Sequence, residues 1–432
     1  MRKLTVASVF LLAAFLAGAS AWAAEGPVPK GIPKLDHVFV IMMENHVYGQ
    51  ISDNPQAPFI NGLMGSANLA TNYFAIAHPS STNYLEVVGG SNFNNLSDQY
   101  PDWHNTSCKP NMLSGIINVD VKQSGFPSVV GPVCPIAGSG GTDANVPVQD
   151  LTNNEGTPPL TNLNGMVGVS PDTDIVGMTI ADQLVARRRT WKSYQEALPI
   201  VGADGVNVSD GYYVEGGLNA QGKSVSTDFS KLTTPGNPTS ASNIVFLYAV
   251  KHNPFAYFAS VQQGTNPNLS LNQIVGFGGE DGLYADLRKG TVPNLAFIAP
   301  NQCNDMHGRG NGTAFCNFDA DDNGSQTGLN PTLILEGDLA VEQIVTAIKA
   351  SKVWSNSKSA IVILWDENDY STSTENQVVV IVDTNYNKSR TTSSNFYTHY
   401  SLTKTLDAAF GLPCLNHACD SNVEVMSDLF AK

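Results

Sequence analysis

Basic side chains are scarce in this sequence. Its 432 residues contain 23 Lys and Arg against 38 Asp and Glu, which gives a formal net charge of −15 at pH 7. Because phosphate backbones bind Lys and Arg, this composition argues against nucleic acid as the main partner. It remains compatible with a small phosphate substrate, since a bound cation can reverse the local electrostatic field.

A hydrophobic run long enough to span a membrane is also lacking. The apolar stretch Leu4–Leu16 is too short for a span and follows the basic residues Arg2 and Lys3. Together with the small-x-small pattern Ala21-Trp22-Ala23, it predicts a signal peptide over residues 1–23. We therefore expect a periplasmic or secreted protein with no integral membrane segment, and an uncleaved anchor is the alternative. The sequence indicates no oligomeric state.

Cysteines are few, and none forms the Cys-x-x-Cys pair of many zinc sites. An even number of cysteines, here 6, favours disulfides in an exported protein. Loop closure favours pairing between sequence neighbours. The expected pairs are Cys108 with Cys134, Cys303 with Cys316, and Cys414 with Cys419.

Buried-strand patterns alternate with amphipathic helices along the chain. This alternation predicts an α/β fold, a three-layer α/β/α sandwich with a mostly parallel central sheet. Residues 94–175 and 202–240 are rich in Gly, Asn, Ser, Pro and Thr, so we expect loop-rich insertions in a single domain over 24–432. Strands are predicted at 37–43, 72–77, 243–249, 256–260, 294–298, 360–365 and 377–382, and helices from near 80 to 89 and at 337–351 and 403–410.

Acidic and amide side chains directly follow two of the buried strands. Glu44 and Asn45 come after the strand 37–43, and Asp366 and Glu367 after 360–365. Ligands of open α/β sheets collect beyond the carboxyl ends of the strands. Adjacent acids repel each other unless a cation neutralises them, so the second pair favours a metal site. For the first pair alone, a polar strand end that merely begins a loop is an equal alternative.

Three further polar clusters follow predicted strands or loops of the sheet. Ser80 begins a predicted helix, where free backbone N–H groups favour a phosphate and a hydroxyl can act as nucleophile; simple capping of the helix by Ser80 or Ser81 is the alternative. Asp305 and His307 can reach one cation if their loop is extended, and a polar turn is the alternative. His399 lies just before a helix, where a single His is more often structural. It becomes a plausible metal ligand when it is considered together with the other polar clusters.

In combination, these motifs resemble the bacterial phosphoesterase family of secreted acid phosphatases and phospholipases C, within the alkaline phosphatase superfamily. The resemblance covers about residues 36–413, thinly in the insertions, and implies an alkaline-phosphatase-like fold. It favours the acid phosphatase branch. The matching segments are Glu44-Asn45, Ala57–Asn61, His78-Pro79-Ser80, Asn83–Leu85, Asn304–His307, Gly337-Asp338 at the opening of a helix, Trp365–Glu367 and His399-Tyr400.

The resemblance implies a metal-dependent phosphomonoesterase with a phosphoserine intermediate. Its nucleophile falls on Ser80, three residues before Asn83, with Ser81 as the fallback. His78 and His252 are candidates for contacting phosphate or protonating the leaving group, and a structural role for His252 is an equal alternative. Asn45 is assigned either to the metal or to the transferring phosphoryl oxygens.

The resemblance also implies a set of metal ligands. The loop around Asp305 departs from the more usual Asp-x-x-x-His spacing, so it leaves open which of Asn304, Asp305 and His307 touches the metal, and how many metals bind. Carboxylate, amide and imidazole ligands suit a divalent Ca, Mn, Fe or Zn ion. The candidate ligands are Glu44, Asn45, Asp305, His307, Asp366, Glu367 and His399.

The sequence therefore predicts an exported, metal-dependent phosphoric monoester hydrolase of the acid phosphatase type. Its substrate would be a small phosphate ester or a phospholipid headgroup. A phospholipase C or other phosphodiesterase on the same scaffold is one alternative, and a non-catalytic calcium- or carbohydrate-binding protein is another. A serine hydrolase is disfavoured because no Gly-x-Ser-x-Gly motif occurs. Asp319–Gly324 resembles the start of a calcium loop, but Asn330 replaces the twelfth-position Glu, so a solvated turn is favoured over an extra structural Ca²⁺.

Overall fold

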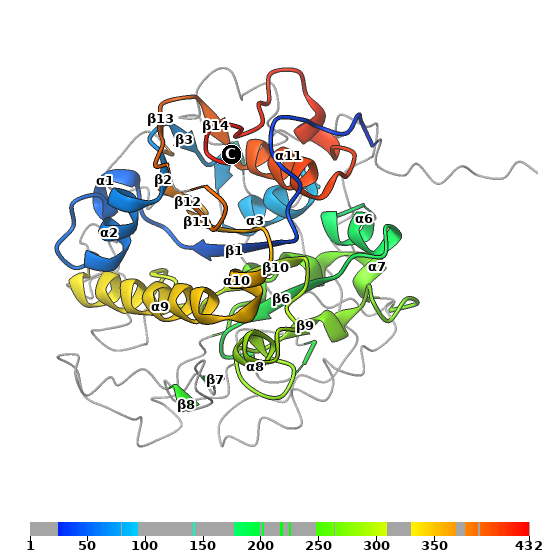
Figure 1. Cartoon of the computed structure of the whole chain (residues 1–432), viewed down its shortest axis with the longest axis horizontal. Coiled ribbons are helices and arrows are strands. Elements are labelled where there is room, and N and C mark those ends of the chain that lie inside the picture. The colour runs from blue at the N-terminus through cyan, green and yellow to red at the C-terminus, as the bar shows by residue number, and fades with distance from the viewer. Residues whose placement is uncertain are drawn as a thin grey trace, which may run out of the picture.

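The chain is built around one central sheet, seen in a computed structural model (Figure 1). The structure describes residues 25–78, 80–93, 141–142, 177–198, 201–202, 217–218, 224–225, 248–262, 264–308, 330–368, 376–387 and 389–431. In this part the sheet has 8 strands in the order β13-β2-β12-β11-β1-β10-β6-β9. They are β1 His37–Met43, β2 Asn68–Ala70, β6 Trp191–Gln195, β9 Ile274–Val275, β10 Leu295–Ala299, β11 Ser359–Trp365, β12 Val380–Thr384 and β13 Thr392–Ser393.

The sheet is mostly parallel, with β12 as the exception. β12 runs antiparallel to both of its neighbours, β11 and β2. β1 lies between β10 and β11 and is parallel to both. Every residue of these three strands is buried except His37, as their continuous apolar runs predict for strands covered on both faces.

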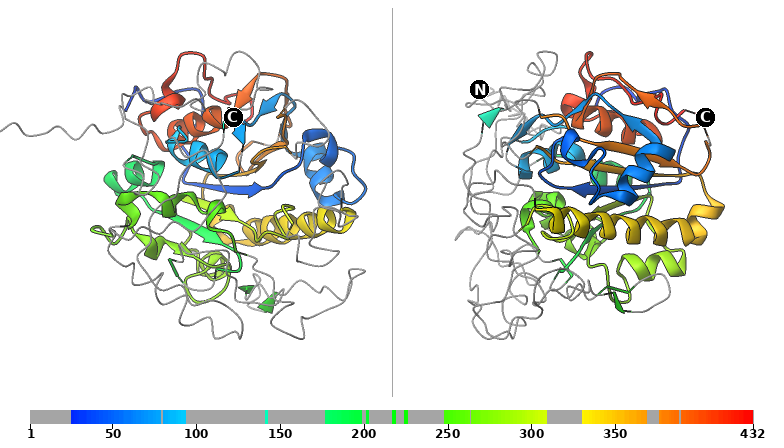
Figure 2. Two further views of the ribbon diagram at one scale, coloured as in Figure 1. Left: turned by 180° about the vertical axis from the view of Figure 1, so that it is seen from behind. Right: turned by 90° about the vertical axis from the view of Figure 1, so that its left-hand side faces the viewer.

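The helices form two groups that cover the sheet from opposite sides. One contains α2, α8, α9 and α10, and the other contains α3, α6 and α11. In both figures α9 and α11 lie on either side of β1 (Figure 2). The helices are α1 Tyr48–Ile51, α2 Pro58–Ser66, α3 Ser80–Gly89, α6 Ile180–Ala186, α7 Ala259–Gln262, α8 Leu283–Lys289, α9 Pro331–Ala350, α10 Lys352–Asn356 and α11 His399–Phe410, with 3₁₀ turns η3 Val250–His252, η4 Pro254–Tyr257, η5 Leu271–Gln273 and η6 Asn416–Cys419.

These layers confirm the predicted α/β/α architecture. The predicted strands at 37–43, 294–298 and 360–365 are confirmed within one residue as β1, β10 and β11. The strand predicted at 377–382 is displaced to Val380–Thr384, and the segment 72–77 divides into two short strands, β3 Tyr73–Phe74 and β4 Ala77–His78.

Three other predictions were wrong. The helix expected at 403–410 begins at His399, so His399 is its first residue rather than a residue just before it. Residues 256–260 form no strand, because Pro254 starts the 3₁₀ turn η4, whose helical φ the proline ring favours. The helix expected at 337–351 begins at Pro331, so Gly337 and Asp338 lie well inside it rather than at its opening. Asn330 caps this helix by accepting from the backbone of Thr332, which accounts for the residue at the twelfth position of the acidic segment.

Several predictions fall partly or wholly outside the described residues. These are the signal peptide, the strand at 243–249 apart from residues 248 and 249, the calcium-loop segment 319–324, and most of the insertions at 94–175 and 202–240. In the insertions, β5 Gly141–Thr142 pairs with β4, and β7 Gly217–Leu218 pairs with β8 Ser224–Val225. The remaining small sheet joins β3 to β14 Tyr397–Thr398.

The disulfide predictions are tested only in part. Cys414 and Cys419 are bonded to each other, as expected. Cys303 is also disulfide-bonded, but its expected partner Cys316 lies outside the described residues, as do Cys108 and Cys134.

Candidate active site

The carboxyl ends of β1 and β11 bring the two acidic clusters together. The strands are parallel and in register, with Met43 opposite Trp365. The backbone N–H of Asp366 donates to the carbonyl of Met43 at 2.9 Å. The backbone N–H of Asn45 donates to the Asp366 carboxylate at 3.0 Å. Asn45 adopts a left-handed φ of 48°, a conformation that Asn tolerates better than most residues and that turns the chain sharply after the strand.

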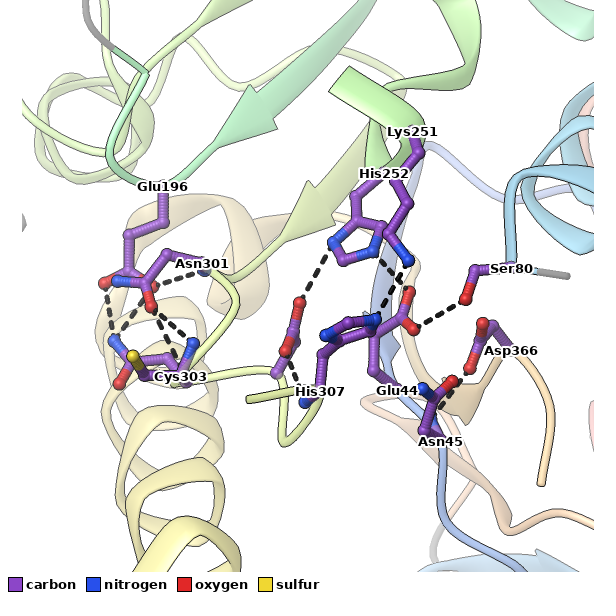
Figure 3. Close-up of polar contacts among 12 residues, drawn as sticks. Glu44, Asn45, Ser80, Glu196, Lys251, His252, Asn301, Cys303, His307 and Asp366 are labelled. Atoms are coloured by element: carbon purple, nitrogen blue, oxygen red, sulfur yellow. Dashed lines mark hydrogen bonds and ion pairs between the residues drawn. The ribbon is translucent and has the colours of Figure 1, made fainter. Parts of the chain in front are cut away.

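Ser80 joins these strand ends from the N-terminus of α3 (Figure 3). Its hydroxyl lies 3.0 Å from Glu44 Oε2 and 3.3 Å from Glu367 Oε1, within hydrogen-bond distance of both. One turn later, the Asn83 amide donates to Glu367 Oε2 at 2.8 Å. All four side chains are buried. A buried hydroxyl held between two carboxylates at a helix N-terminus is a suitable arrangement for nucleophilic attack on a phosphate.

His252 lies between two acids on the other side of Glu44. Its Nε2 is 3.1 Å from Glu44 Oε1 and its Nδ1 is 3.1 Å from Asp305 Oδ2. The ring stacks on Tyr84 of α3, with centroids 5.2 Å apart and planes 7° apart. The stacking fixes the ring plane, so that both nitrogens face carboxylates. The structure therefore places His252 within the site rather than in the apolar core.

His307 reaches the site through Lys251. The ammonium group of Lys251 lies 2.9 Å from His307 Nε2, and His307 Nδ1 lies 2.7 Å from the carbonyl oxygen of Gly308. Since the carbonyl can only accept, Nδ1 carries the proton and the Nε2 lone pair faces Lys251. The backbone N–H of His307 donates to the Asp305 carboxylate at 2.7 Å, which couples these two predicted ligands.

The site holds more negative charge than its own cations balance. Burial raises the pKa of Glu44 well above its usual range, and the nearby Asp366 raises it further. Burial also raises the pKa of Asp305 strongly. For Asp366, burial and the adjacent Glu367 raise the pKa to about 7. Such clusters of raised carboxyl pKa values are typical of functional sites.

The donor atoms fit a divalent cation. Asn45 Oδ1 and Asp366 Oδ2 are buried and make no hydrogen bond within the described residues, and Glu44 Oε1 and Asp305 Oδ2 have only the contacts with His252. Leaving such atoms unsatisfied is costly, and a cation would satisfy them. One ligand atom each from Glu44, His252 and His307 lies within 4.8 Å of the others. Oxygen and imidazole donors suit Ca, Mn, Fe or Zn.

His399 contacts the site indirectly. Its Nε2 lies 2.7 Å from the backbone oxygen of Asp366, and its Nδ1 lies 3.0 Å from the hydroxyl of Tyr73. Burial lowers its pKa to about 4, so the ring is neutral at pH 7. Both ring nitrogens are therefore engaged within the protein. The side chain of His78, at the end of β4, lies outside the described residues.

Two residues of this region were not predicted from the sequence. Lys251 directly precedes His252, and its only sequence signal was that position. Glu196 follows β6 just as Glu44 follows β1, but β6 itself was not predicted because Lys192, Ser193 and Gln195 interrupt its apolar pattern.

The chain is similar in sequence to known phosphoesterases. The model of a family described as the phosphoesterase family matches residues 51–315. A phosphatidylinositol-3-phosphatase of Mycobacterium tuberculosis is 31% identical over 113 residues, which is 25% of this chain and 37% of that protein. A phosphate-repressible acid phosphatase of Penicillium chrysogenum is 25% identical over 82% of this chain and 55% of its own length. The chain thus spans about half, or less, of the lengths of these relatives.

A solved structure of a protein in the alkaline phosphatase superfamily from Vibrio parahaemolyticus also resembles the chain. It has 11% identity and a TM-score of 0.42, and the match covers 95% of this chain and 73% of that one. In the described part of the chain, no helix is both long enough and apolar enough to cross a membrane.

Proposed function

Since this chain belongs to the phosphoesterase family, we propose that it is an exported, metal-dependent acid phosphatase that hydrolyses phosphate monoesters through a phosphoserine. The main support for this proposal is the position of Ser80, which lies at the N-terminus of α3 and within hydrogen-bond distance of Glu44 and Glu367. The name of the Penicillium relative supports the acid phosphatase class.

The buried carboxylate and amide oxygens of the site indicate which residues would hold the metal. Asn45 and Asp366 each offer a buried oxygen that makes no hydrogen bond within the described residues, Glu44 offers a buried carboxylate between Ser80 and His252, and Glu367 adds a carboxylate on the Ser80 side. Asp305 and His307 extend the set toward Lys251. When bound, a divalent cation would neutralise the acids, polarise phosphoryl oxygens and lower the pKa of the serine hydroxyl.

Ser80 performs the first displacement. Its Oγ forms a bond to phosphorus while the bond between phosphorus and the leaving oxygen breaks on the opposite side. The hydroxyl proton passes to Glu44 or Glu367, which both lie within hydrogen-bond distance of it. The positive end of the α3 dipole stabilises the equatorial phosphoryl oxygens.

The leaving group and the phosphoserine complete the cycle. The departing alkoxide takes its proton from water. His252 lies between Glu44 and Asp305, and because burial lowers its pKa well below the usual range, its neutral ring orients these two acids rather than protonating the leaving group. Water then attacks the phosphoserine, releasing phosphate and restoring the Ser80 hydroxyl. Lys251 places a positive charge beside the acids throughout.

Turnover of p-nitrophenyl phosphate with and without chelator tests this function. We expect release of inorganic phosphate that falls below about 1% after chelation and returns with one of Ca²⁺, Mn²⁺, Fe²⁺ or Zn²⁺. Full activity in the chelated protein would show that the metal assignment is wrong. The absence of turnover with every metal, for any ester of a monoester panel, would refute the phosphatase itself.

A phosphorylated lipid headgroup is a second candidate substrate. The partial match to a phosphatidylinositol-3-phosphatase favours it over other large substrates. A phosphatase releases inorganic phosphate from such a lipid, whereas a phospholipase C releases a phosphorylated headgroup. Product analysis on phosphoinositide and phosphatidylcholine vesicles therefore separates the phosphatase from the phosphodiesterase alternative. A non-catalytic binding protein would release neither product.

A further inference from the structure

Glu196 forms a buried polar network next to the candidate active site (Figure 3). The residue directly follows β6 and is 6% exposed. Its Oε2 accepts from the backbone N–H of Asn301 at 2.9 Å. Both of its carboxylate oxygens lie 2.9 Å from the amide nitrogen of Asn304. One carboxylate thus holds two points of the loop that follows β10.

This loop leads directly into Asp305 and His307. The Asn301 side chain accepts from the backbone N–H groups of Cys303 at 3.0 Å and Asn304 at 3.1 Å. The N–H of Asp305 donates to the Asn301 carbonyl at 2.8 Å. The turn is therefore fixed immediately before the two side chains that face His252 and Lys251.

Helix α9 limits the same loop from another side. A Cβ on Gly337 would overlap the Met306 side chain and lie 3.2 Å from the carbonyl oxygen of Asn304. Met306 has a left-handed φ of 79°. Because the backbone of α9 approaches this closely, the loop has little room to move and lies between α9 and the contacts that Glu196 makes.

We propose that Glu196 is a positioning residue for the proposed phosphatase: through Asn301 and Asn304 it fixes Asp305 and His307 at the edge of the metal and phosphate site. This role rests on the proposed function. Glu196 reaches the loop through Asn301 and Asn304, and Asn304 is itself one of the three residues of this loop left open as a metal ligand. Groups that orient metal ligands in this way typically change metal affinity or activity about 10- to 100-fold when removed.

The first test compares Glu196→Ala with Asp286→Asn in the full-length mature protein. Asp286 is a matched control, because it is also a buried acid bonded to β6, through the Tyr194 hydroxyl at 2.7 Å. We expect Glu196→Ala to lower kcat/KM for p-nitrophenyl phosphate and the affinity for Mn²⁺ by about 10- to 100-fold each. Asp286→Asn should leave both within about threefold.

Hydrogen exchange gives a readout that does not depend on turnover. In Glu196→Ala, the amide of Asn301 loses its acceptor, so peptides covering 301–305 should exchange faster than in the wild type or Asp286→Asn. Equal exchange in all three proteins would overturn the positioning role, as would a folded Glu196→Ala variant with wild-type kcat/KM and Mn²⁺ affinity.

A double variant that keeps the total charge of the Glu196–Asn304 pair tests whether the lost activity can be restored. In Glu196→Gln, one amide group faces the amide group of Asn304, and a hydrogen bond is lost. Adding Asn304→Asp restores a donor and an acceptor in the reverse direction, so the double variant should recover at least about threefold of the lost kcat/KM. A double variant no better than Glu196→Gln would overturn the role. A wild type without turnover on any ester would instead refute the proposed function, whatever the variants do.

Discussion

The Ser80 hydroxyl donates to the Glu44 carboxylate across 3.0 Å, although the residues are 36 positions apart in the sequence. The contact links the N-terminus of α3 to the end of β1. It places a nucleophile, a proton acceptor and the positive end of a helix dipole at one point. Simple helix capping would not require a second carboxylate, yet Glu367 also lies within hydrogen-bond distance of the same hydroxyl.

Replacing Ser80 separates catalysis from capping. We expect Ser80→Ala to reduce kcat by at least about 1,000-fold, because the nucleophile is lost while the fold remains. Ser81→Ala is the matched control, since Ser81 is equally buried on the next position of α3. The measured rate of phosphate release should fall by this factor only in Ser80→Ala. Loss in Ser81→Ala alone would transfer the nucleophile to that residue.

The sequence predicted the centre of the sheet well, for a clear physical reason. β1 and β11 are buried on both faces, so they are unbroken apolar runs followed at once by polar residues. Glu44 and Asp366 could therefore be assigned to strand ends. Their proximity follows from parallel pairing, which aligns those ends at one edge.

Other parts of the site depend on contacts that the sequence does not display. β6 contains three polar residues among its five, and the polar side chains of Lys192 and Ser193 bond to Asp286 and Asn253 inside the protein, so the strand shows no continuous apolar run. Glu196 thus had no recognisable strand before it. The contact of His399 with the carbonyl of Asp366, 33 residues away, arises only when α11 packs against the sheet.

Asp338 stabilises α2 from a different helix. Its carboxylate accepts from the backbone N–H groups of Phe59 at 3.1 Å and Ile60 at 2.8 Å, at the start of α2. We expect Asp338→Ala to lower the free energy of unfolding by about 1 to 2 kcal/mol, as for loss of a helix cap. Urea denaturation measures this change. Glu342→Gln, at an exposed position on the same helix, should have almost no effect, and an equal loss there would contradict the capping role.

Asp407 should make stability depend on pH. It is fully buried in the last turn of α11, and burial raises its pKa well above the usual range. In the unfolded chain an Asp ionises at about pH 3.9. Between that pH and the raised pKa, only the unfolded state releases the proton, so the folded state loses stability as pH rises.

The variant Asp407→Asn cannot ionise and avoids this loss. Its melting temperature relative to the wild type should therefore increase steadily from pH 4.5 to pH 8, in chelated protein. Asp281→Asn, at an exposed position, serves as the control and should show a nearly constant difference. A pH-independent difference for Asp407→Asn would show that this carboxyl is ionised in the folded protein at every pH tested.

Lys251 should act in opposite directions on cations and anions. Its ammonium group lowers the pKa of Glu44 and Asp305 and lies 2.9 Å from His307 Nε2. In Lys251→Met, the acids lose that positive neighbour, so Mn²⁺ should bind about tenfold more tightly, a gain of about 1.4 kcal/mol. Inorganic phosphate, a competitive inhibitor of the proposed reaction, should bind about tenfold more weakly.

The opposite changes expected in Mn²⁺ and phosphate affinity distinguish this electrostatic role of Lys251 from damage to the fold. A distorted site would weaken Mn²⁺ and phosphate together, whereas removal of one positive charge favours the cation and disfavours the anion. Lys251→Arg keeps the charge and should stay near the wild type in both measurements. Titration calorimetry with Mn²⁺ and phosphate inhibition constants provide the two values. Parallel weakening in Lys251→Met would mean that the lysine supports His307 structurally and does not set the charge of the site.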